Sequence, residues 1–101
     1  MKICFDIDGV LATTVEDLDY MEAGPIQENI DLANKLFEDG HYIVLYTARG
    51  SETGIDWFER TEKQLAGFGL RWHKLVLGKP AADYYVDDKL VTIEQLKELL
   101  T

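Results

Sequence analysis

Four short polar segments of this sequence carry the side chains that could do chemistry. They are Asp6-Ile7-Asp8-Gly9, Thr47-Ala48-Arg49, Gly78-Lys79-Pro80 and Asp87-Asp88, and each comes at or just after the end of an apolar run. Such runs predict buried β-strands. If the strands are parallel, their carboxyl ends meet at one edge of the sheet, which is where open α/β sheets bind ligands. We therefore expect these side chains to share one crevice.

The acidic segments predict a metal site. Asp6 and Asp8 are separated by one residue, so in an extended segment their side chains point the same way. Two carboxylates at a strand end repel each other unless a cation lies between them. Asp87 and Asp88 repeat the acidic pattern after a very short apolar run. Magnesium is commonly held by one or two carboxylates plus substrate phosphate, so the four aspartates favour Mg²⁺ over two solvated turns.

The other two segments carry groups suited to a phosphoryl oxygen. The Thr47 hydroxyl and the backbone amides near it could bind such an oxygen, and Lys79 would bring an ammonium to the same place. Arg49 could reach a substrate phosphate or carboxylate through two hydrogen bonds, and a surface salt bridge is the alternative. Taken alone, a lysine such as Lys79 is usually a solvated charge, and Thr47 is a weak signal because threonine is common in strands. Their combination with the aspartates favours phosphoryl chemistry.

Alternating strands and helices must position these residues. Apolar patterns predict strands at 2–7, 42–46, 71–77 and 84–86, and helices at 25–39, from about 55 to 67, and at 92–100. Thr92 and Gln95 would form a capping box at the start of the last helix. We expect one domain over residues 1–101, a three-layer, Rossmann-like α/β fold with helices on both faces of a four-stranded parallel sheet of order 3-2-1-4. Residues 10–25 predict an acidic loop or flap over the strand ends.

Several side chains outside the motifs are expected to have structural roles. Cys4 is the only cysteine, and we expect a buried, reduced thiol. Phe58 and Leu65 should point inward from the second helix, and His73 should pack within its strand. The pair Tyr84-Tyr85 is expected in the core or at an interface.

Composition limits the classes of function. The chain has 101 residues, 19 acidic and 10 basic side chains, and a formal net charge of −9. Such a chain repels phosphate backbones and has no basic run, so we expect no nucleic-acid partner. No apolar stretch is long enough to span a bilayer and no signal peptide is visible, so we expect no membrane partner and a cytoplasmic location.

In their order along the chain, Asp6-Ile7-Asp8-Gly9-Val10, Thr47, Lys79 and Asp87-Asp88 resemble the four motifs of the haloacid dehalogenase (HAD) superfamily. The sequence around Thr47 and Lys79 also resembles small bacterial phosphatases of capsule or lipopolysaccharide biosynthesis. The resemblance implies an HAD-like core, and the spacings between the motifs leave no room for a cap domain. The presence of Asp8 implies a phosphatase rather than a dehalogenase.

The resemblance also implies a role for each motif residue. Asp6 would be the nucleophile that forms an aspartyl phosphate. Asp8 would be the general acid and then the general base. Thr47 would bind the phosphoryl group, and Lys79 would stabilise charge on it. The substrate-contacting residues would be Thr47, Ala48, Arg49 and Lys79, and the Mg²⁺ ligands would be Asp6, the backbone carbonyl of Asp8, Asp87 and, directly or through water, Asp88.

Three hypotheses of function follow. The first is a Mg²⁺-dependent phosphomonoesterase that acts on a small substrate such as a sugar phosphate. The second is a phospho-accepting receiver-like domain, in which the acidic pair and the acceptor lie on different strands, whereas Asp6 and Asp8 share one. The third is a catalytically idle binding or assembly module. Because no cap is present, the 10–25 loop or a second copy of the chain would have to cover the site, so homo-oligomers are also expected.

Overall fold

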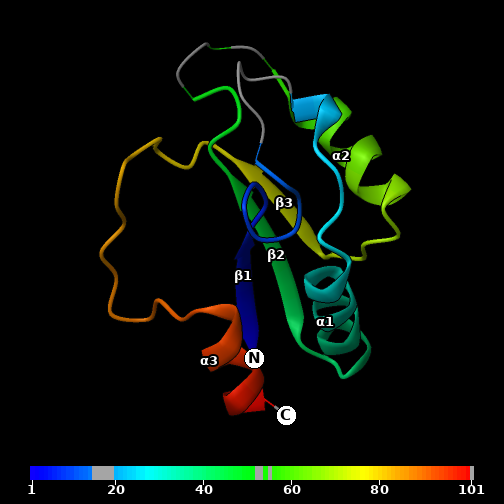
Figure 1. The fold of residues 1–101 in the computed structure, drawn as a ribbon, viewed down its shortest axis with the longest axis vertical. Coiled ribbons are helices and arrows are strands. Elements are labelled where there is room, and N and C mark those ends of the chain that lie inside the picture. Colours follow the sequence, from blue (N-terminus) through cyan, green and yellow to red (C-terminus); the bar gives the residue numbers. More distant parts are fainter. Residues whose placement is uncertain (15–19, 52–53, 55, 101) are drawn as a thin grey trace.

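A computed structural model of the chain describes residues 1–14, 20–51, 54 and 56–100 (Figure 1). Its elements are β1 (Lys2–Asp6), η1 (Tyr20–Glu22), α1 (Gln27–Glu38), β2 (Tyr42–Thr47), α2 (Phe58–Gly67), β3 (Lys74–Leu77) and α3 (Ile93–Leu100). Strands and helices alternate as predicted, and the third strand is shorter than expected. Part of the predicted flap, residues 15–19, lies outside the described residues.

The three strands form one parallel sheet with β2 in the centre. Asp6 at the end of β1 is opposite Tyr46 of β2, and Thr47 at the end of β2 is opposite Leu77 of β3. The carboxyl ends of the strands therefore meet at one edge, as the sequence predicts. This edge positions the polar residues that follow each strand.

The predicted fourth strand is absent, so the described sheet has three strands and keeps only the 3-2-1 part of the expected order. Residues 81–92 are exposed throughout and run beside the sheet to α3, as the yellow and orange segment of Figure 1 shows. Val86 is 100% exposed. The apolar run at 84–86 has only three residues between aspartates, so pairing there would form few hydrogen bonds and bury little apolar surface.

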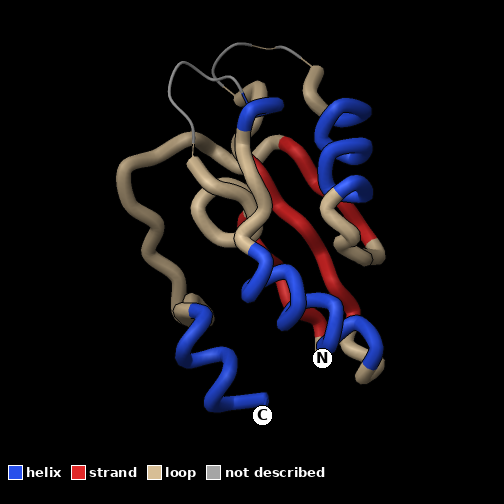
Figure 2. Tube along the Cα trace, turned by 45° about the vertical axis from the view of Figure 1, so that its right-hand side comes forward, coloured by secondary structure: helices blue, strands red, loops and turns tan. Residues whose placement is uncertain are grey.

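Helices cover one face of the sheet, so the prediction of a three-layer fold is wrong. Phe5, Leu45 and Leu75 lie opposite one another on this face, and they join a single core with side chains from all three helices, including Ile30, Ala33, Leu36, Leu65 and Leu96. Figure 2 shows the helices and strands as two layers. The other face carries Lys2, Cys4 and Lys74, which are exposed. Cys4 is thus exposed rather than buried, because no described helix packs over its face.

Local signals explain how the helices begin and end. α1 begins two residues after Pro25 and ends before Gly40, whose φ of +94° favours glycine. The predicted capping box begins α3: the Thr92 N–H donates to Gln95 Oε1 at 2.9 Å, and the Gln95 N–H donates to Thr92 Oγ1 at 3.1 Å. Among the described residues, no helix combines the length and apolarity needed to cross a membrane.

The packing predictions for individual side chains have mixed outcomes. Leu65 is fully buried as expected, but Phe58 is 42% exposed because Trp57, just before α2, takes the inward position. The ring of His73 is stacked between those of Phe37 and Tyr42, at centroid distances of 4.5 and 4.7 Å, which confirms its packing role. Tyr84 is 88% exposed, so it is not a core residue.

Candidate functional site

A tight turn after β1 positions the two aspartates. The carbonyl of Ile7 accepts N–H bonds from Val10, Leu11 and Ala12, at 3.2, 2.8 and 3.0 Å. Gly9 has a φ of +90°, a backbone conformation that residues other than glycine rarely adopt. Ile7 itself is fully buried. The buried isoleucine and the closed turn therefore fix the backbone on both sides of Asp8.

Lys79 and Asp6 form an ion pair at the carboxyl edge of the sheet. The Lys79 Nζ lies 3.1 Å from Asp6 Oδ2, and their side chains are 16% and 37% exposed. The other oxygen, Asp6 Oδ1, accepts the N–H of Ile7 at 2.9 Å. The loop after β3 places the lysine, because its N–H donates to the Thr47 carbonyl at 3.1 Å and its carbonyl accepts the Ser51 hydroxyl at 2.7 Å. A cation and a carboxylate thus meet where the sequence predicts.

Tyr85 lies against the Lys79 ammonium, a contact that the sequence did not indicate. The Lys79 Nζ is 4.1 Å from the centroid of the Tyr85 ring. The Tyr85 hydroxyl donates to the Pro80 carbonyl at 2.5 Å and accepts the Ala82 N–H at 3.2 Å. This part of the exposed segment is therefore folded back onto the lysine.

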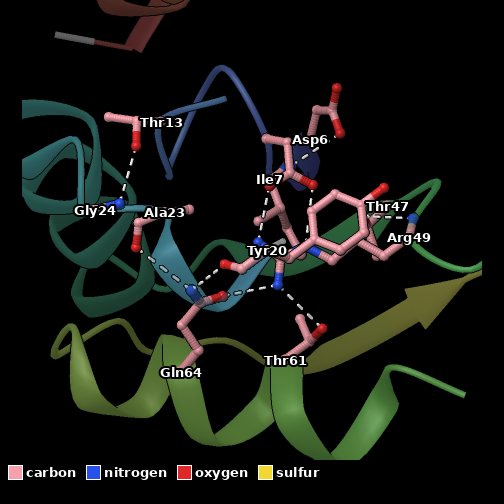
Figure 3. Close-up of polar contacts among 11 residues, drawn as sticks. Asp6, Ile7, Thr13, Tyr20, Ala23, Gly24, Thr47, Arg49, Thr61 and Gln64 are labelled. Carbon is pink, nitrogen blue, oxygen red and sulfur yellow. Dashed lines mark hydrogen bonds and ion pairs between the residues drawn. The ribbon is translucent and has the colours of Figure 1, made fainter. Parts of the chain in front are cut away.

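Thr47 ends β2 and is fully buried. Its Oγ1 accepts the backbone N–H of Arg49 at 3.1 Å (Figure 3). A hydroxyl that accepts one hydrogen bond still has its own hydrogen to donate. Because the side chain is fully buried, the predicted phosphoryl contact at Thr47 is not available in this arrangement, although the hydroxyl keeps a hydrogen to donate.

Arg49 has a different partner from those predicted. Its Nε donates to Asp8 Oδ2 at 3.0 Å and its Nη2 donates to Asp8 Oδ1 at 2.8 Å, a two-pronged pair. The residue is only 2% exposed, so this is neither a surface salt bridge nor an arginine that presents its side chain to a substrate. Its Nη1 donates to Thr61 Oγ1 at 3.1 Å and to Gln64 Oε1 at 2.7 Å (Figure 3). The structure therefore assigns the guanidinium to Asp8 and α2.

The contacts of Gln64 extend this group to the segment before α1. The Gln64 Nε2 donates to the carbonyl of Tyr20 at 2.6 Å and to that of Ala23 at 3.4 Å (Figure 3). The centroid of the Tyr20 ring lies 4.8 Å from the Arg49 guanidinium carbon, and this ring makes a T-shaped contact with Trp57 at a centroid distance of 5.1 Å. Asp8, Arg49 and Gln64 thus connect the end of β1 with residues 20–23.

The predicted magnesium ligands do not assemble in this structure. Asp87 and Asp88 are exposed, and Asp87 Oδ1 accepts the N–H of Lys89 at 2.8 Å. Among the described residues there is no group of three or more His, Cys, Asp or Glu side chains that could hold a metal ion. Asp6 and Asp8 reach the carboxyl edge, but Lys79 and Arg49 bond their side-chain oxygens. In this structure Asp87 and Asp88 are therefore apart from Asp6 and Asp8, and the four aspartates do not form one site.

Cys4 lies close to the Asp6–Lys79 pair. Partial burial raises the pKa of the Cys4 thiol, the Lys79 ammonium opposes this shift, and the Asp6 carboxylate adds to it. The alternation of side chains along β1, which puts Cys4 on the side of Asp6, could have indicated this neighbourhood. No sequence signal indicates that Thr61 and Gln64 bind Arg49, because that contact depends on how α2 packs.

The comparisons with known proteins identify the fold and no family. No protein-family model matches the chain, and no relative is found among curated proteins. A crystal structure of an MCSG target from Vibrio cholerae superposes with a TM-score of 0.77 at 21% identity, and the match covers 97% of this chain and 94% of that one. A chain in the structure of a Pnkp1/Rnl/Hen1 complex matches with a TM-score of 0.62 at 18% identity, over 98% of this chain and 34% of that one. At these identities the likeness shows a shared α/β fold.

Proposed function

We propose that this chain is a phosphomonoesterase of the HAD type that uses Asp6 as its nucleophile and acts on a small ester such as a sugar phosphate. The main support is the Lys79 ammonium, 3.1 Å from Asp6 Oδ2 at the carboxyl edge of the sheet. An ion pair between these residues serves a phosphatase well, because the cation can shift from the carboxylate to the phosphoryl oxygens as charge moves onto them.

The chemistry has two steps. In the first, a carboxylate oxygen of Asp6 attacks phosphorus, the bond from phosphorus to the leaving oxygen breaks, and Asp8 gives its proton to that oxygen. In the second, water attacks the phosphorus of the aspartyl phosphate, Asp8 takes a proton from the water, and inorganic phosphate leaves. For Thr47 to donate a hydrogen bond to a phosphoryl oxygen in both steps, as the proposal also holds, its fully buried hydroxyl must become accessible when substrate binds. The net reaction adds one water and gives an alcohol and phosphate.

Magnesium is part of this proposal, with Asp6, the backbone carbonyl of Asp8, Asp87 and Asp88 as its ligands. Carboxylate and carbonyl oxygens are the donors that Mg²⁺ prefers, and a bound ion would add positive charge beside the phosphoryl oxygens. Assembly of these ligands requires residues 83–88 to approach β1. Two observations support this approach. Tyr85 of this segment already contacts Lys79, and among the described residues no strand pairs with β1 on the side away from β2.

The test is hydrolysis of an aryl phosphate by the wild type and Asp6→Asn, each with Mg²⁺ and with EDTA. Asp31→Asn, at an exposed position in α1, is the matched control. Turnover that needs Mg²⁺ and disappears only in Asp6→Asn supports the proposal. Equal turnover in Asp6→Asn rejects Asp6 as nucleophile. A wild type that keeps a stable phosphoryl group without turnover indicates a receiver-like domain instead.

A further inference from the structure

The strongest unexplained feature of the site is the position of Arg49. Its side chain is completely buried, and it holds both oxygens of Asp8, whose side chain is 23% exposed. Replacing a buried ion pair by apolar side chains is often neutral or stabilising, because removing two charges from water is costly. Folding stability is therefore a weak reason for this pair, and the proposed acid-base role of Asp8 offers a stronger one.

The geometry leaves Asp8 able to transfer protons. A carboxylate has about four lone-pair sites, and a two-pronged arginine occupies one on each oxygen. The remaining sites can carry a proton or accept one from water. Because the guanidinium is planar and rigid, its two hydrogen bonds fix the plane of the carboxylate as well as its position. Asp8 would otherwise turn about its side-chain bonds at the partly exposed edge of the sheet.

Residues of α2 hold the Arg49 guanidinium through the nitrogen that does not contact Asp8. Thr61 and Gln64, one turn apart on α2, both accept hydrogen bonds from its Nη1, at 3.1 and 2.7 Å. Gln64 in turn donates to the carbonyls of Tyr20 and Ala23. Figure 3 shows Gln64 between these carbonyls and Arg49. The orientation of Asp8 thus depends on α2 and on residues 20–23, both distant from it in sequence.

We infer that Arg49 is a positioning residue for Asp8, and that Gln64 links this pair to residues 20–23. The position of residues 20–23 therefore affects the orientation of Asp8 in the acid-base step. The inference rests on the proposed function. It predicts that Arg49 acts through Asp8 and makes no essential contact with the substrate.

The experiment compares two substrates: an aryl phosphate with an acidic phenol, whose leaving group needs little protonation, and an alkyl phosphate, whose leaving group needs a proton. The quantity compared is kcat/KM, which covers the steps through departure of the leaving group, whereas the second step is common to both substrates. General acid catalysis typically contributes about 10²–10⁴-fold, so Asp8→Asn should lower kcat/KM for the alkyl phosphate by that order and for the aryl phosphate by much less. Arg49→Met should show the same dependence on the leaving group with a smaller loss. Arg49→Lys, which restores the charge without the planar fork, should recover part of it.

The double variant separates positioning from other roles. If Arg49 acts through Asp8, Asp8→Asn combined with Arg49→Met should be no slower than Asp8→Asn alone. A multiplicative loss in the double variant overturns the inference. So does a rise in KM with unchanged kcat, which would make Arg49 a substrate anchor, or an equal loss of kcat/KM on both substrates, which a distorted fold would produce.

Gln64 and a surface arginine complete the design. Gln64→Glu keeps an acceptor for Arg49 but loses the donor to Tyr20 and Ala23, so its loss should also be larger for the alkyl phosphate. Arg71→Met breaks an exposed ion pair with Glu38, and it should leave both rates unchanged. If the wild type shows no turnover, the proposed function and this inference both fail. If Asp6→Asn abolishes turnover but the Arg49 variants match the wild type, only this inference fails.

Discussion

The Lys79 ammonium lies 3.1 Å from a carboxylate oxygen of Asp6, although the two residues belong to distant parts of the chain. The parallel sheet brings them together: Asp6 ends β1, and the loop after β3 is bonded to the end of β2 through the Lys79 N–H. A cation beside a carboxylate at this edge is the arrangement on which the proposed chemistry depends.

Removing this cation should slow the reaction without unfolding the protein. Lys79→Met should lower kcat about 10²–10³-fold, the range seen when a group that stabilises transition-state charge is removed. Steady-state kinetics with an aryl phosphate measures this loss. Lys74→Met removes an exposed lysine from the start of β3 and should keep the wild-type kcat. An unchanged kcat in Lys79→Met would show that Lys79 has only a structural role.

The Cys4 thiol should report the charges of the site. Partial burial raises the pKa of this exposed thiol, so less thiolate is present near neutral pH. Alkylation by iodoacetamide should therefore keep accelerating above the pH at which an ordinary cysteine has levelled off. Because Asp6 raises this pKa and Lys79 lowers it, the rate at a fixed, mildly alkaline pH should increase in Asp6→Asn and decrease in Lys79→Met. Mass spectrometry of the single cysteine gives the rate. Identical rates in the three proteins would contradict the described neighbourhood.

The same thiol tests whether the exposed segment approaches β1. If Mg²⁺ with a phosphate analogue such as beryllium fluoride draws residues 83–88 toward Asp6, alkylation of Cys4 should slow on their addition. Asp87→Asn combined with Asp88→Asn should abolish this protection. Magnesium-free buffer with EDTA gives the reference rate. A Cys4 that reacts equally fast in all conditions would argue against a metal site shared by Asp6 and the Asp87-Asp88 pair.

The capping box of α3 should contribute measurably to stability. Thr92→Ala removes the side-chain acceptor for the Gln95 N–H, and the loss of such a cap typically lowers the free energy of unfolding by about 0.5–2 kcal/mol. Thr92→Ser retains the hydroxyl and should lose much less. Urea denaturation followed by circular dichroism measures both values. Equal stability of the alanine variant and the wild type would mean that α3 does not unfold cooperatively with the core.

Local patterns predicted much of the fold. Apolar patterns predicted the helix at 25–39, which the structure shows as α1, and Thr92 with Gln95 predicted the start of α3. These signals depend on neighbours in sequence and on a regular period. The prediction of a fourth strand was wrong because a run of three apolar residues is too short to show the alternation of side chains that distinguishes a strand from a loop.

Contacts of the site that depend on where the strands end were predicted, and contacts that depend on how the helices pack were not. Asp6 and Lys79 meet because parallel strands end at a common edge, which the order of elements already implies. The contacts of Arg49 with Thr61 and Gln64 could not be predicted, because they depend on how α2 packs. The exposure of Cys4 likewise depends on which face of the sheet the helices cover.

The most direct test of the central claim is detection of a phosphoryl group on Asp6 during turnover. The enzyme is mixed with an excess of substrate and Mg²⁺, quenched in acid within the first turnovers, and analysed by peptide mass spectrometry. We predict a phosphorylated peptide that contains Asp6, present during turnover, absent once substrate is exhausted, and never found in Asp6→Asn. Turnover that persists in Asp6→Asn, or a phosphoryl group on another residue, would contradict the account.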